Sequence, residues 1–574
     1  MSSIAHAAGP IEIEGARKAR RNLTRNRIRL AMILGCFLFL VVAGRLVMLA
    51  MAGVDETIPG QVQSALTASR PALLDRNGIE MAMDIQAPSL FAEPRNIVDL
   101  DEAVEKLARA LPELDPAFIR DRLDGDEGFV WLARELTLAQ QDQIFRLGIP
   151  GVDFLSETKR YYPGGPVAAH ILGAVNIDNV GIAGIERHID LEEVALLQQL
   201  GFARSRTLEP MNLSIDLRVQ NAVHRELTDA LTRYQAIAAA GVMMDVQTGE
   251  IVALVSLPDF DPNNPASALE PLNGDKDARI NRITAGTFEL GSTFKTITMA
   301  AALDSGAVSI TDRFDARSAV HFGRFAIDDF HGEHRVLAVP EIYKYSSNIG
   351  IIKVMQTLGK DNYRAFLTTI GLDASPIIEL PERKAASVPE RFSDVGAATA
   401  AFGHGLSVTP LQLVTAYAAI INGGTFIPPT LFARTPDEAA VLGRRVISPE
   451  TSALMRYLMR LNGLEGTGRR TSEIADGFRA GGKTGTAEKV IDGRYSSDVT
   501  LAVFASAFPM DAPRYAMVIL VDEPDRENPQ SGKTAAWNAG DVSGRIIQRV
   551  GPMLGVLPDF DPEIDRAIVP EILR

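Results

Sequence analysis

The sequence predicts an α+β domain over residues 206–574, preceded by a single transmembrane helix and a scaffold domain. Two apolar runs, 241–245 and 250–256, flank a turn that ends in glycine, which is typical of a β-hairpin. Two more strand-like runs lie near the C-terminus, at 500–508 and 515–521. Because helix candidates fill the chain between these pairs, the sequence favours one domain whose sheet joins distant parts of the chain.

Residues 30–53 predict the transmembrane helix, after a basic cytoplasmic tail at 1–29. The stretch is apolar over 24 residues apart from Arg45, which suffices to cross a bilayer core of about 30 Å. The basic residues before it are Arg17, Lys18, Arg20, Arg21, Arg25, Arg27 and Arg29, and the next one after it is Arg70. By the positive-inside rule the tail stays in the cytoplasm and the rest is exported. The alternative is a cleaved signal peptide, because AMA at 50–52 resembles a cleavage site.

Composition bounds the number of domains and the partners. A chain of 574 residues is too long for one core, so two or three domains are expected. Eight of the 58 basic and two of the 72 acidic residues precede residue 54, which leaves 50 basic and 70 acidic residues in the exported part. This negative charge repels phosphate backbones and argues against a nucleic-acid partner. The single cysteine, Cys36, excludes a disulfide framework and a cysteine-based metal site.

The scaffold is predicted over residues 54–205. A polar connector at 54–69 precedes a strand-like stretch at 70–78, which ends in an Asn-Gly turn. Apolar residues within 103–111 recur at helical spacing, and a second turn follows at 161–165. No cluster of catalytic side chains stands out here, which indicates a structural role.

The last domain contains the first motif with chemical potential, Ser292 and Lys295, at the start of a helix expected at 293–303. Three positions apart, their side chains share one face of the helix. A serine hydroxyl becomes a nucleophile when a base takes its proton, and lysine can be that base if burial or another cation lowers its pKa. The helix N-terminus adds partial positive charge where an oxyanion would form. The same spacing at 156–159 is interpreted as a chance match.

A second motif is formed by Ser346 and Asn348, which are two residues apart. In an extended segment both side chains point the same way, so that a hydroxyl can relay a proton and an amide can hold a peptide group. The alternative is an ordinary helix start, since serine and asparagine are common caps.

The third motif, Lys483, Thr484, Gly485 and Thr486, is typical of a strand edge. The lysine and the two hydroxyls can bind a carboxylate, and the glycine would let a substrate approach the backbone closely. A glycine-rich turn with a surface lysine is the alternative.

Together, the three motifs resemble the signature of penicillin-binding proteins and serine β-lactamases. Similar motifs extend over about residues 70–525. They are DRNG at 75–78, RYYPG at 160–164, AH at 169–170, GIE at 184–186, DPN at 261–263, GHG at 403–405 and TPLQ at 409–412. The set is similar to class B penicillin-binding proteins, and FVWLAR at 129–134 with GIPGV at 148–152 is similar to their septal, FtsI-like branch. One departure is Leu290, where the family usually has proline; we expect it to alter the loop entering the helix.

The resemblance implies a penicillin-binding/serine β-lactamase-like transpeptidase fold at 206–574 on an elongated pedestal at 54–205. It further implies that Ser292 attacks the penultimate D-alanine of a stem peptide while Lys295 takes its proton, without metal or organic cofactor. Ser346 would then relay a proton to the departing D-alanine.

The remaining site residues are assigned by the same resemblance. Asn348 would position the substrate amide, and Lys483, Thr484 and Thr486 would bind the terminal carboxylate. The oxyanion hole maps onto the backbone N–H groups of Ser292 and Thr486. A second stem peptide's amine would resolve the ester and form the cross-link, and β-lactams would acylate Ser292.

The resemblance also implies the location and the partners. It places the chain in the bacterial inner membrane as a single-pass protein with its bulk in the periplasm. Since no glycosyltransferase sequence separates the anchor from the last domain, a SEDS-family glycan polymerase and other division proteins are the expected partners.

Four alternatives to this interpretation exist. A β-lactamase shares the three motifs, but the water and base that hydrolysis needs cannot be identified. A non-catalytic division scaffold conflicts with the intact motifs. GFRAGGKT at 477–484 fits a phosphate loop, with MVILVDE at 517–523 as its acidic strand, but its flanks lack the expected strand and helix. DDFHGEH at 328–334 has potential metal ligands, and a solvated loop is the interpretation.

Overall fold

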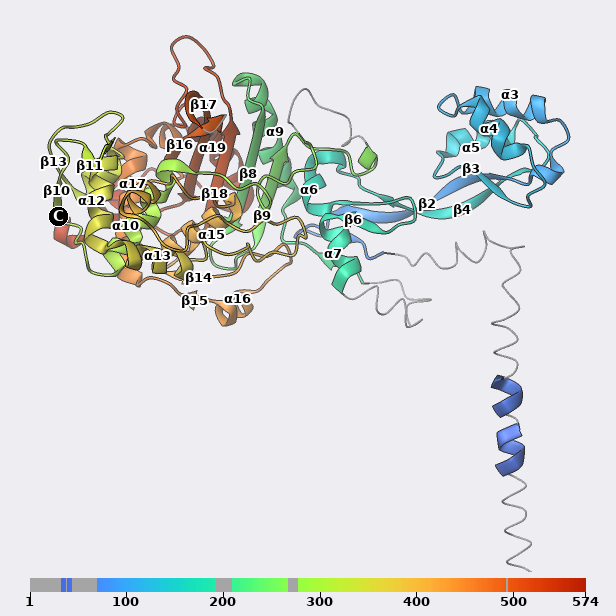
Figure 1. Cartoon of the computed structure of the whole chain (residues 1–574), viewed down its shortest axis with the longest axis horizontal. Helices are drawn as coiled ribbons and strands as arrows, with labels where there is room; N and C mark the ends of the chain where they lie inside the picture. Colours follow the sequence, from blue (N-terminus) through green and yellow to red (C-terminus); the bar gives the residue numbers. More distant parts are fainter. Residues whose placement is uncertain (1–31, 38, 44–69, 193–208, 267–276, 492–493) are drawn as a thin grey trace, which may run out of the picture. The chain divides into compact units, whose positions relative to one another are not determined.

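The computed structural model describes residues 32–37, 39–43, 70–192, 209–266, 277–491 and 494–574 (Figure 1). The chain divides into two compact units. Unit 1 contains Met1–Leu66 and Pro88–Ser156, and unit 2 contains Thr67–Ala87 and Glu157–Arg574. The predicted pedestal range, 54–205, spans parts of both units, and its boundaries stay a prediction.

Most of the predicted anchor, 30–53, lies outside the described residues. Residues 32–37 and 39–43 are helical. Within the described ranges, no helix is both long and apolar enough to cross a membrane. The anchor therefore remains a prediction from the sequence.

Unit 1 has a small core of its own. Its described elements are α3 (Leu100–Ala110), α4 (Pro116–Leu123), β3 (Val130–Ala133), α5 (Leu138–Phe145) and parts of β2 (Glu80–Ala92) and β4 (Val152–Tyr161). The Asp99 side chain caps α3, and this helix buries Ala103, Val104 and Leu107 on one face. The helical spacing predicted within 103–111 is confirmed.

Unit 2 is organised around a five-stranded antiparallel sheet in the order β16-β17-β18-β8-β9. Its strands are β8 (Ala238–Asp245), β9 (Ile251–Leu257), β16 (Gly481–Ile491), β17 (Arg494–Phe508) and β18 (Tyr515–Asp522). Val518 of β18 pairs with Val242 of β8, so strands from the two ends of the domain are neighbours. The predicted sheet joining distant parts of the chain is confirmed.

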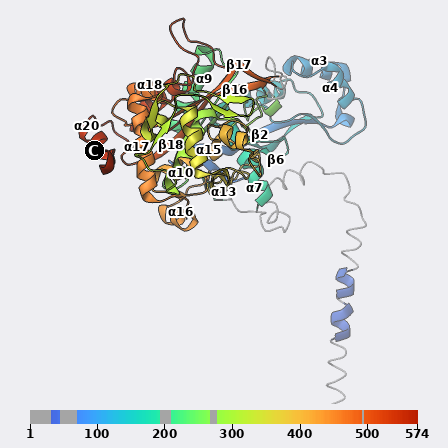
Figure 2. The ribbon, with the colours of Figure 1, turned by 60° about the vertical axis from the view of Figure 1, so that its left-hand side comes forward.

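Both faces of this sheet are covered by helices. Successive residues along β8 enter different cores, as Val242 and Met243 do, because side chains alternate between the two faces of a strand. On one face lie α15 (Pro410–Ile421) and α10 (Phe294–Asp304), and on the other α9 (Leu217–Arg233) and α19 (Ala539–Val550). The turned view separates α10 and α15 from α9 (Figure 2). The domain is therefore a helix–sheet–helix sandwich.

The other elements of unit 2 connect and extend these layers. The helices are α6 (Ala169–Leu172), α7 (Gly184–Glu192), α11 (Val339–Lys344), α12 (Asn348–Leu358), α13 (Lys360–Thr369), α14 (Asp394–Ala400), α16 (Pro436–Leu442), α17 (Pro449–Glu465), α18 (Arg469–Ile474) and α20 (Pro562–Ile568). The short strands are β1 (Leu73–Leu74), β5 (Ala174–Val175), β6 (Gly181–Ala183), β7 (Met211–Asn212), β10 (Arg313–Asp315), β11 (Val320–Phe322), β12 (Phe325–Ile327), β13 (Val336–Ala338), β14 (Thr425–Phe426) and β15 (Arg444–Arg445).

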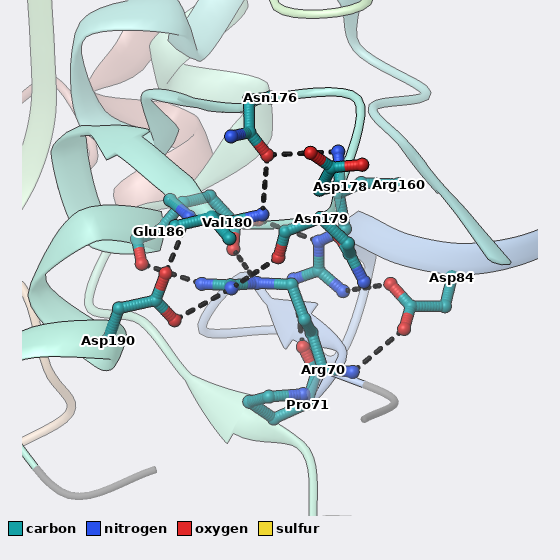
Figure 3. A network of polar contacts seen from close by, with 11 residues as sticks. Arg70, Pro71, Asp84, Arg160, Asn176, Asp178, Asn179, Val180, Glu186 and Asp190 are labelled. Atoms are coloured by element: carbon teal, nitrogen blue, oxygen red, sulfur yellow. Dashed lines mark hydrogen bonds and ion pairs between the residues drawn. The ribbon is translucent and has the colours of Figure 1, made fainter. Parts of the chain in front are cut away.

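A buried ion network joins distant segments of unit 2 (Figure 3). The fully buried Glu186 accepts hydrogen bonds from Nε of Arg70 and Nε of Arg160, both at 2.7 Å. Asp190 pairs with Arg70 and Asp84 with Arg160. Buried charges are tolerated because each is paired. The segments at 70–78, 160–164 and 184–186 thus meet in a structural element.

Candidate active site

Ser292 lies on a short 3₁₀ turn, Gly291–Thr293, that leads into α10. Gly291 has a φ of +54°, a conformation that favours glycine. A Cβ on Gly485 of β16 would lie 2.3 Å from the carbonyl oxygen of Leu290, and one on Gly403 would lie 2.1 Å from that of Gly291. These glycines let β16 and the loop before α15 approach the serine turn closely. At its Cβ position Gly485 makes room for the serine turn, and its role in the approach of a substrate stays a prediction.

Leu290, the residue where proline was expected, is fully buried in the core beside Phe294. Its carbonyl accepts a hydrogen bond from the Thr293 hydroxyl at 2.8 Å. Leu290 thus anchors the serine turn through apolar packing.

Lys295 is a buried lysine of the site, with 1% of its surface exposed. Its Nζ donates to Oγ of Ser346 at 3.0 Å, to Oδ1 of Asn348 at 2.7 Å and to the carbonyl of Ser346. Three acceptors match the three donors of an ammonium group. Burial nevertheless lowers the pKa of Lys295 to about 7, although the Asp329 carboxylate opposes this shift. The lysine is therefore available as a neutral base near neutral pH.

Ser346 lies at the centre of the three motifs. Its backbone has a φ of +58°, which is uncommon for a non-glycine residue. Its Oγ accepts from Nζ of Lys295 at 3.0 Å and from Nζ of Lys483 at 2.9 Å. Both lone pairs of the hydroxyl are thus occupied, which leaves its proton to be donated.

Lys483 extends from β16 and is completely buried. Burial lowers its pKa well below the usual value, and the neighbouring Lys295 lowers it further. The adjacent Thr484 bonds through its hydroxyl to that of Thr467 at 2.8 Å, and Thr486 accepts from the backbone N–H of Ala535 at 3.2 Å. The hydroxyls of Thr467 and Thr484 therefore lie near the lysine that contacts Ser346, and such groups can bind a carboxylate.

The structure brings together the predicted lysines, Ser346 and Asn348, and sets the Ser292 turn against β16. In the described part of the chain, the Ser292 hydroxyl has no hydrogen-bond partner, so it is not engaged by Lys295. The lookalike at 156–159 lies in β4.

Two contributors to the site were missed from the sequence. Thr467 lies within 3.5 Å of Nζ of Lys483 and is held by Oδ1 of the buried Asn462 at 3.2 Å. Its only signal is the pair of flanking glycines, Gly466 and Gly468.

A buried hydroxyl chain was also missed. The Thr296 hydroxyl bonds to those of Tyr343 and Tyr417, and Tyr417 donates to the carbonyl of Thr293 at 2.8 Å. It fixes α10 against α11 and α15. No spacing in the sequence announces it, because its members come from three helices.

The structure also bears on two alternatives from the sequence, a metal site at 328–334 and a phosphate loop at 477–484. No group of three or more histidine, cysteine or acidic side chains in the described ranges can hold a metal. Instead, Asp329 accepts hydrogen bonds from the start of α12, so the loop is more than a solvated connection. The last residues of 477–484 belong to β16 and open no helix, which excludes a phosphate loop.

Comparisons with known proteins show which families the chain resembles. Residues 239–543 match the family described as penicillin binding protein transpeptidase domain, and residues 65–192 match the penicillin-binding protein dimerisation domain. The probable peptidoglycan D,D-transpeptidase FtsI of Caulobacter vibrioides is 35% identical over 556 residues, covering 95% of this chain and 91% of the relative. FtsI of Escherichia coli K12 is 30% identical over 554 residues, covering 91% of each. The fold is similar to penicillin binding protein 3 of Mycobacterium tuberculosis in complex with aztreonam, with a TM-score of 0.65, 24% identity and coverage of 86% and 98%.

Proposed function

Because the chain belongs to the family of penicillin-binding protein transpeptidases, we propose that it is a peptidoglycan D,D-transpeptidase whose acyl-enzyme forms on Ser292. The family membership makes it a serine-type transpeptidase of class B. The residue assignment rests on one observation: the hydroxyl of Ser346 accepts hydrogen bonds from both Lys295 and Lys483. These residues are 51 and 137 positions apart from it, so folding brings side chains of all three motifs to one place, which supports a shared reaction centre.

In the acylation step, neutral Lys295 takes the proton of Ser292 as its Oγ attacks the carbonyl carbon of the penultimate D-alanine. The oxyanion is stabilised by the backbone N–H groups of Ser292 and Thr486. The pKa of about 7 for Lys295 supports this role, since a general base is most effective when its pKa is near the working pH.

Ser346 protonates the leaving group. Its hydroxyl donates a proton to the amine of the terminal D-alanine as the C–N bond breaks, and a lysine neighbour replaces that proton. Lys483, Thr484 and Thr486 bind the terminal carboxylate, and Asn348 holds the donor peptide amide. The amine of a second stem peptide then attacks the ester carbon, a proton passes from this amine through Lys295 to Oγ of Ser292 as the C–O bond breaks, and the cross-link forms.

The setting of the reaction is part of the proposal. Similarity to FtsI of two bacteria supports a role in septal wall synthesis, with the chain anchored in the inner membrane and its bulk in the periplasm. The expected partners are a SEDS-family polymerase and other division proteins. The solved relative in complex with aztreonam supports covalent binding of β-lactams to Ser292.

The test is labelling of membranes with fluorescent penicillin. We expect a covalent band near 62.0 kDa that disappears in Ser292→Ala and persists in Ser156→Ala, the variant of the lookalike motif. A band that fades within minutes would indicate a β-lactamase instead. Persistent labelling of Ser292→Ala would refute the nucleophile.

A further inference from the structure

We propose that Asp329 is a positioning residue for acylation, which holds the start of α12 so that Ser346 and Asn348 face Lys295. The inference rests on the proposed function, in which Lys295 is the base. It concerns a residue of the connection between β12 and β13 that belongs to none of the three motifs.

The contacts of Asp329 are concentrated on the second motif. Its Oδ2 accepts a hydrogen bond from the Ser347 hydroxyl at 2.8 Å. Its Oδ1 accepts from the backbone N–H groups of Asn348, at 2.5 Å, and of Ile349, at 3.0 Å. Through these hydrogen bonds the loop holds the two residues that follow Ser346 in the chain.

An ordinary helix cap does not account for this arrangement. Ser347 already caps α12, because its Oγ accepts from the N–H of Gly350 at 2.9 Å. Asp329 adds a second cap from 18 residues upstream and satisfies the two N–H groups that Ser347 leaves over.

The side chain of Asn348 is fixed at both ends. Its Nδ2 donates to the carbonyl of Asp328 at 3.2 Å, and its Oδ1 accepts from Nζ of Lys295 at 2.7 Å. Because the carbonyl can only accept, the amide oxygen is directed to the lysine. The pair Asp328 and Asp329 therefore sets both the place and the orientation of this amide.

The hydrogen bonds of Asp329 also support the backbone conformation of Ser346. A non-glycine residue at a φ of +58° is strained, and it persists where its surroundings leave no alternative. Here the Asp329 carboxylate holds the neighbouring Ser347 and Asn348 by hydrogen bonds. The conformation places the Ser346 hydroxyl between the two lysines.

The charge of Asp329 also acts on Lys295. It raises the pKa of the lysine against the larger effect of burial. The other charged or titratable groups that influence the same site are Lys483 on β16 and His404 in the loop before α15, and they remain in an Asp329 variant. Removing the carboxylate lowers the pKa of Lys295 further, so the neutral base forms at lower pH.

The experiment measures the rate of acylation of the full-length protein by fluorescent penicillin between pH 5.5 and 9. In Asp329→Asn we expect a plateau lowered about tenfold, because the amide and hydroxyl are less well placed, and an acid limb moved to lower pH. In Asp329→Glu the limb should stay at the wild-type pH, because the charge is kept, while the plateau falls.

Asp216→Asn is the matched control, since Asp216 caps α9 by accepting from the N–H groups of Arg218 and Val219 far along the chain from the motifs. Its rate profile should equal that of the wild type. An unmoved acid limb in Asp329→Asn would overturn the inference and leave a purely structural cap.

If Asp329→Asn does not fold, an unchanged plateau in Asp329→Glu would overturn the inference. Failure of the wild type to be labelled at Ser292 would instead refute the proposed function, so the two failures are distinct.

Discussion

Ser346 and Ser347 are adjacent serines with different tasks. The Ser346 hydroxyl receives hydrogen bonds from two buried lysines, whereas the Ser347 hydroxyl caps α12 and donates to Asp329. The sequence permitted both readings of the motif, a proton relay and a helix cap. The structure assigns the cap to Ser347 and leaves Ser346 outside the helix, with a left-handed backbone.

This division of tasks predicts opposite effects of two alanine substitutions. Ser346→Ala should lower the penicillin acylation rate by about 10²–10⁴-fold, since a proton donor is lost, with little change in unfolding free energy. Ser347→Ala should lower the unfolding free energy by about 1 kcal/mol, the usual cost of a lost cap. Acylation kinetics and thermal unfolding of both variants measure this. Equal loss of stability in the two would contradict it.

The pKa of Lys295 predicts the pH dependence of the wild type. The base must be neutral, so below a pH of about 7 the protonated lysine limits acylation, and the rate should rise as pH increases through about 7. Lys295→Arg should be inactive over the whole range, because arginine does not deprotonate in proteins. A rate independent of pH between 5.5 and 8 would rule out this role for the lysine.

At the scale of elements, the site depends on how closely the serine turn approaches β16. The carbonyl of Leu290 occupies the place where Gly485 would carry a Cβ, and the Thr293 side chain lies 2.9 Å from that place. A strand and a helix start can be this close only where a side chain is missing. The glycine of the third motif thus lets the Ser292 turn pack closely against β16.

Gly485→Ala should therefore separate the turn from the strand. We expect a cost of about 1–3 kcal/mol in unfolding free energy, typical of overpacking, and a loss of acylation larger than the loss of folded protein. Gly164→Ala is the control, because nothing lies within 4 Å of its Cβ position and its φ is negative. Wild-type acylation in Gly485→Ala would contradict the close approach.

The ion network around Glu186 is a second element with a definite energetic role. Glu186→Gln keeps the shape of the side chain but removes the negative charge that pairs with the buried guanidinium groups of Arg70 and Arg160. This change should lower the unfolding free energy by about 3–5 kcal/mol. Glu105→Gln, in an exposed pair with Arg109, should change stability little. Denaturant unfolding measures both, and equal effects would contradict the structural role of the network.

At the scale of the molecule, the described residues form separate hydrophobic cores. Unit 1 has its own core, which includes Leu107, and the two cores of unit 2 flank the five-stranded sheet. All residues proposed for catalysis belong to unit 2. Stability of unit 1 and formation of the acyl-enzyme are therefore separable.

Leu107→Ala tests this separation. Leu107 is 1% exposed, so its truncation should destabilise unit 1 by about 2–5 kcal/mol. Limited proteolysis should then cut within 88–156 sooner, while penicillin acylation of Ser292 stays at the wild-type rate. Parallel loss of acylation would show that the units fold as one. Ile144→Val, in the same core, should give a smaller effect of the same kind.

The sequence by itself determined the chemistry and the class of fold. Ser292 with Lys295, Ser346 with Asn348, and the segment at 483–486 are local patterns, because a helix turn or a strand edge fixes the relation of residues a few positions apart. Two apolar runs that flank a turn likewise predicted the hairpin at 241–256, and the helix expected at 293–303 after Ser292 is present as α10. The boundaries of the domains and the membrane anchor stay predictions.

Only the tertiary structure decided how these patterns meet. Asp329, Thr467 and Tyr417 act on motif residues from other elements, and no local spacing encodes a contact formed by folding. The lowered pKa of Lys295 likewise depends on burial, which the motif does not contain. At Gly485 the sequence indicated a close approach to the backbone, and only the packing of β16 against the serine turn revealed that the protein's own backbone lies at the Cβ position.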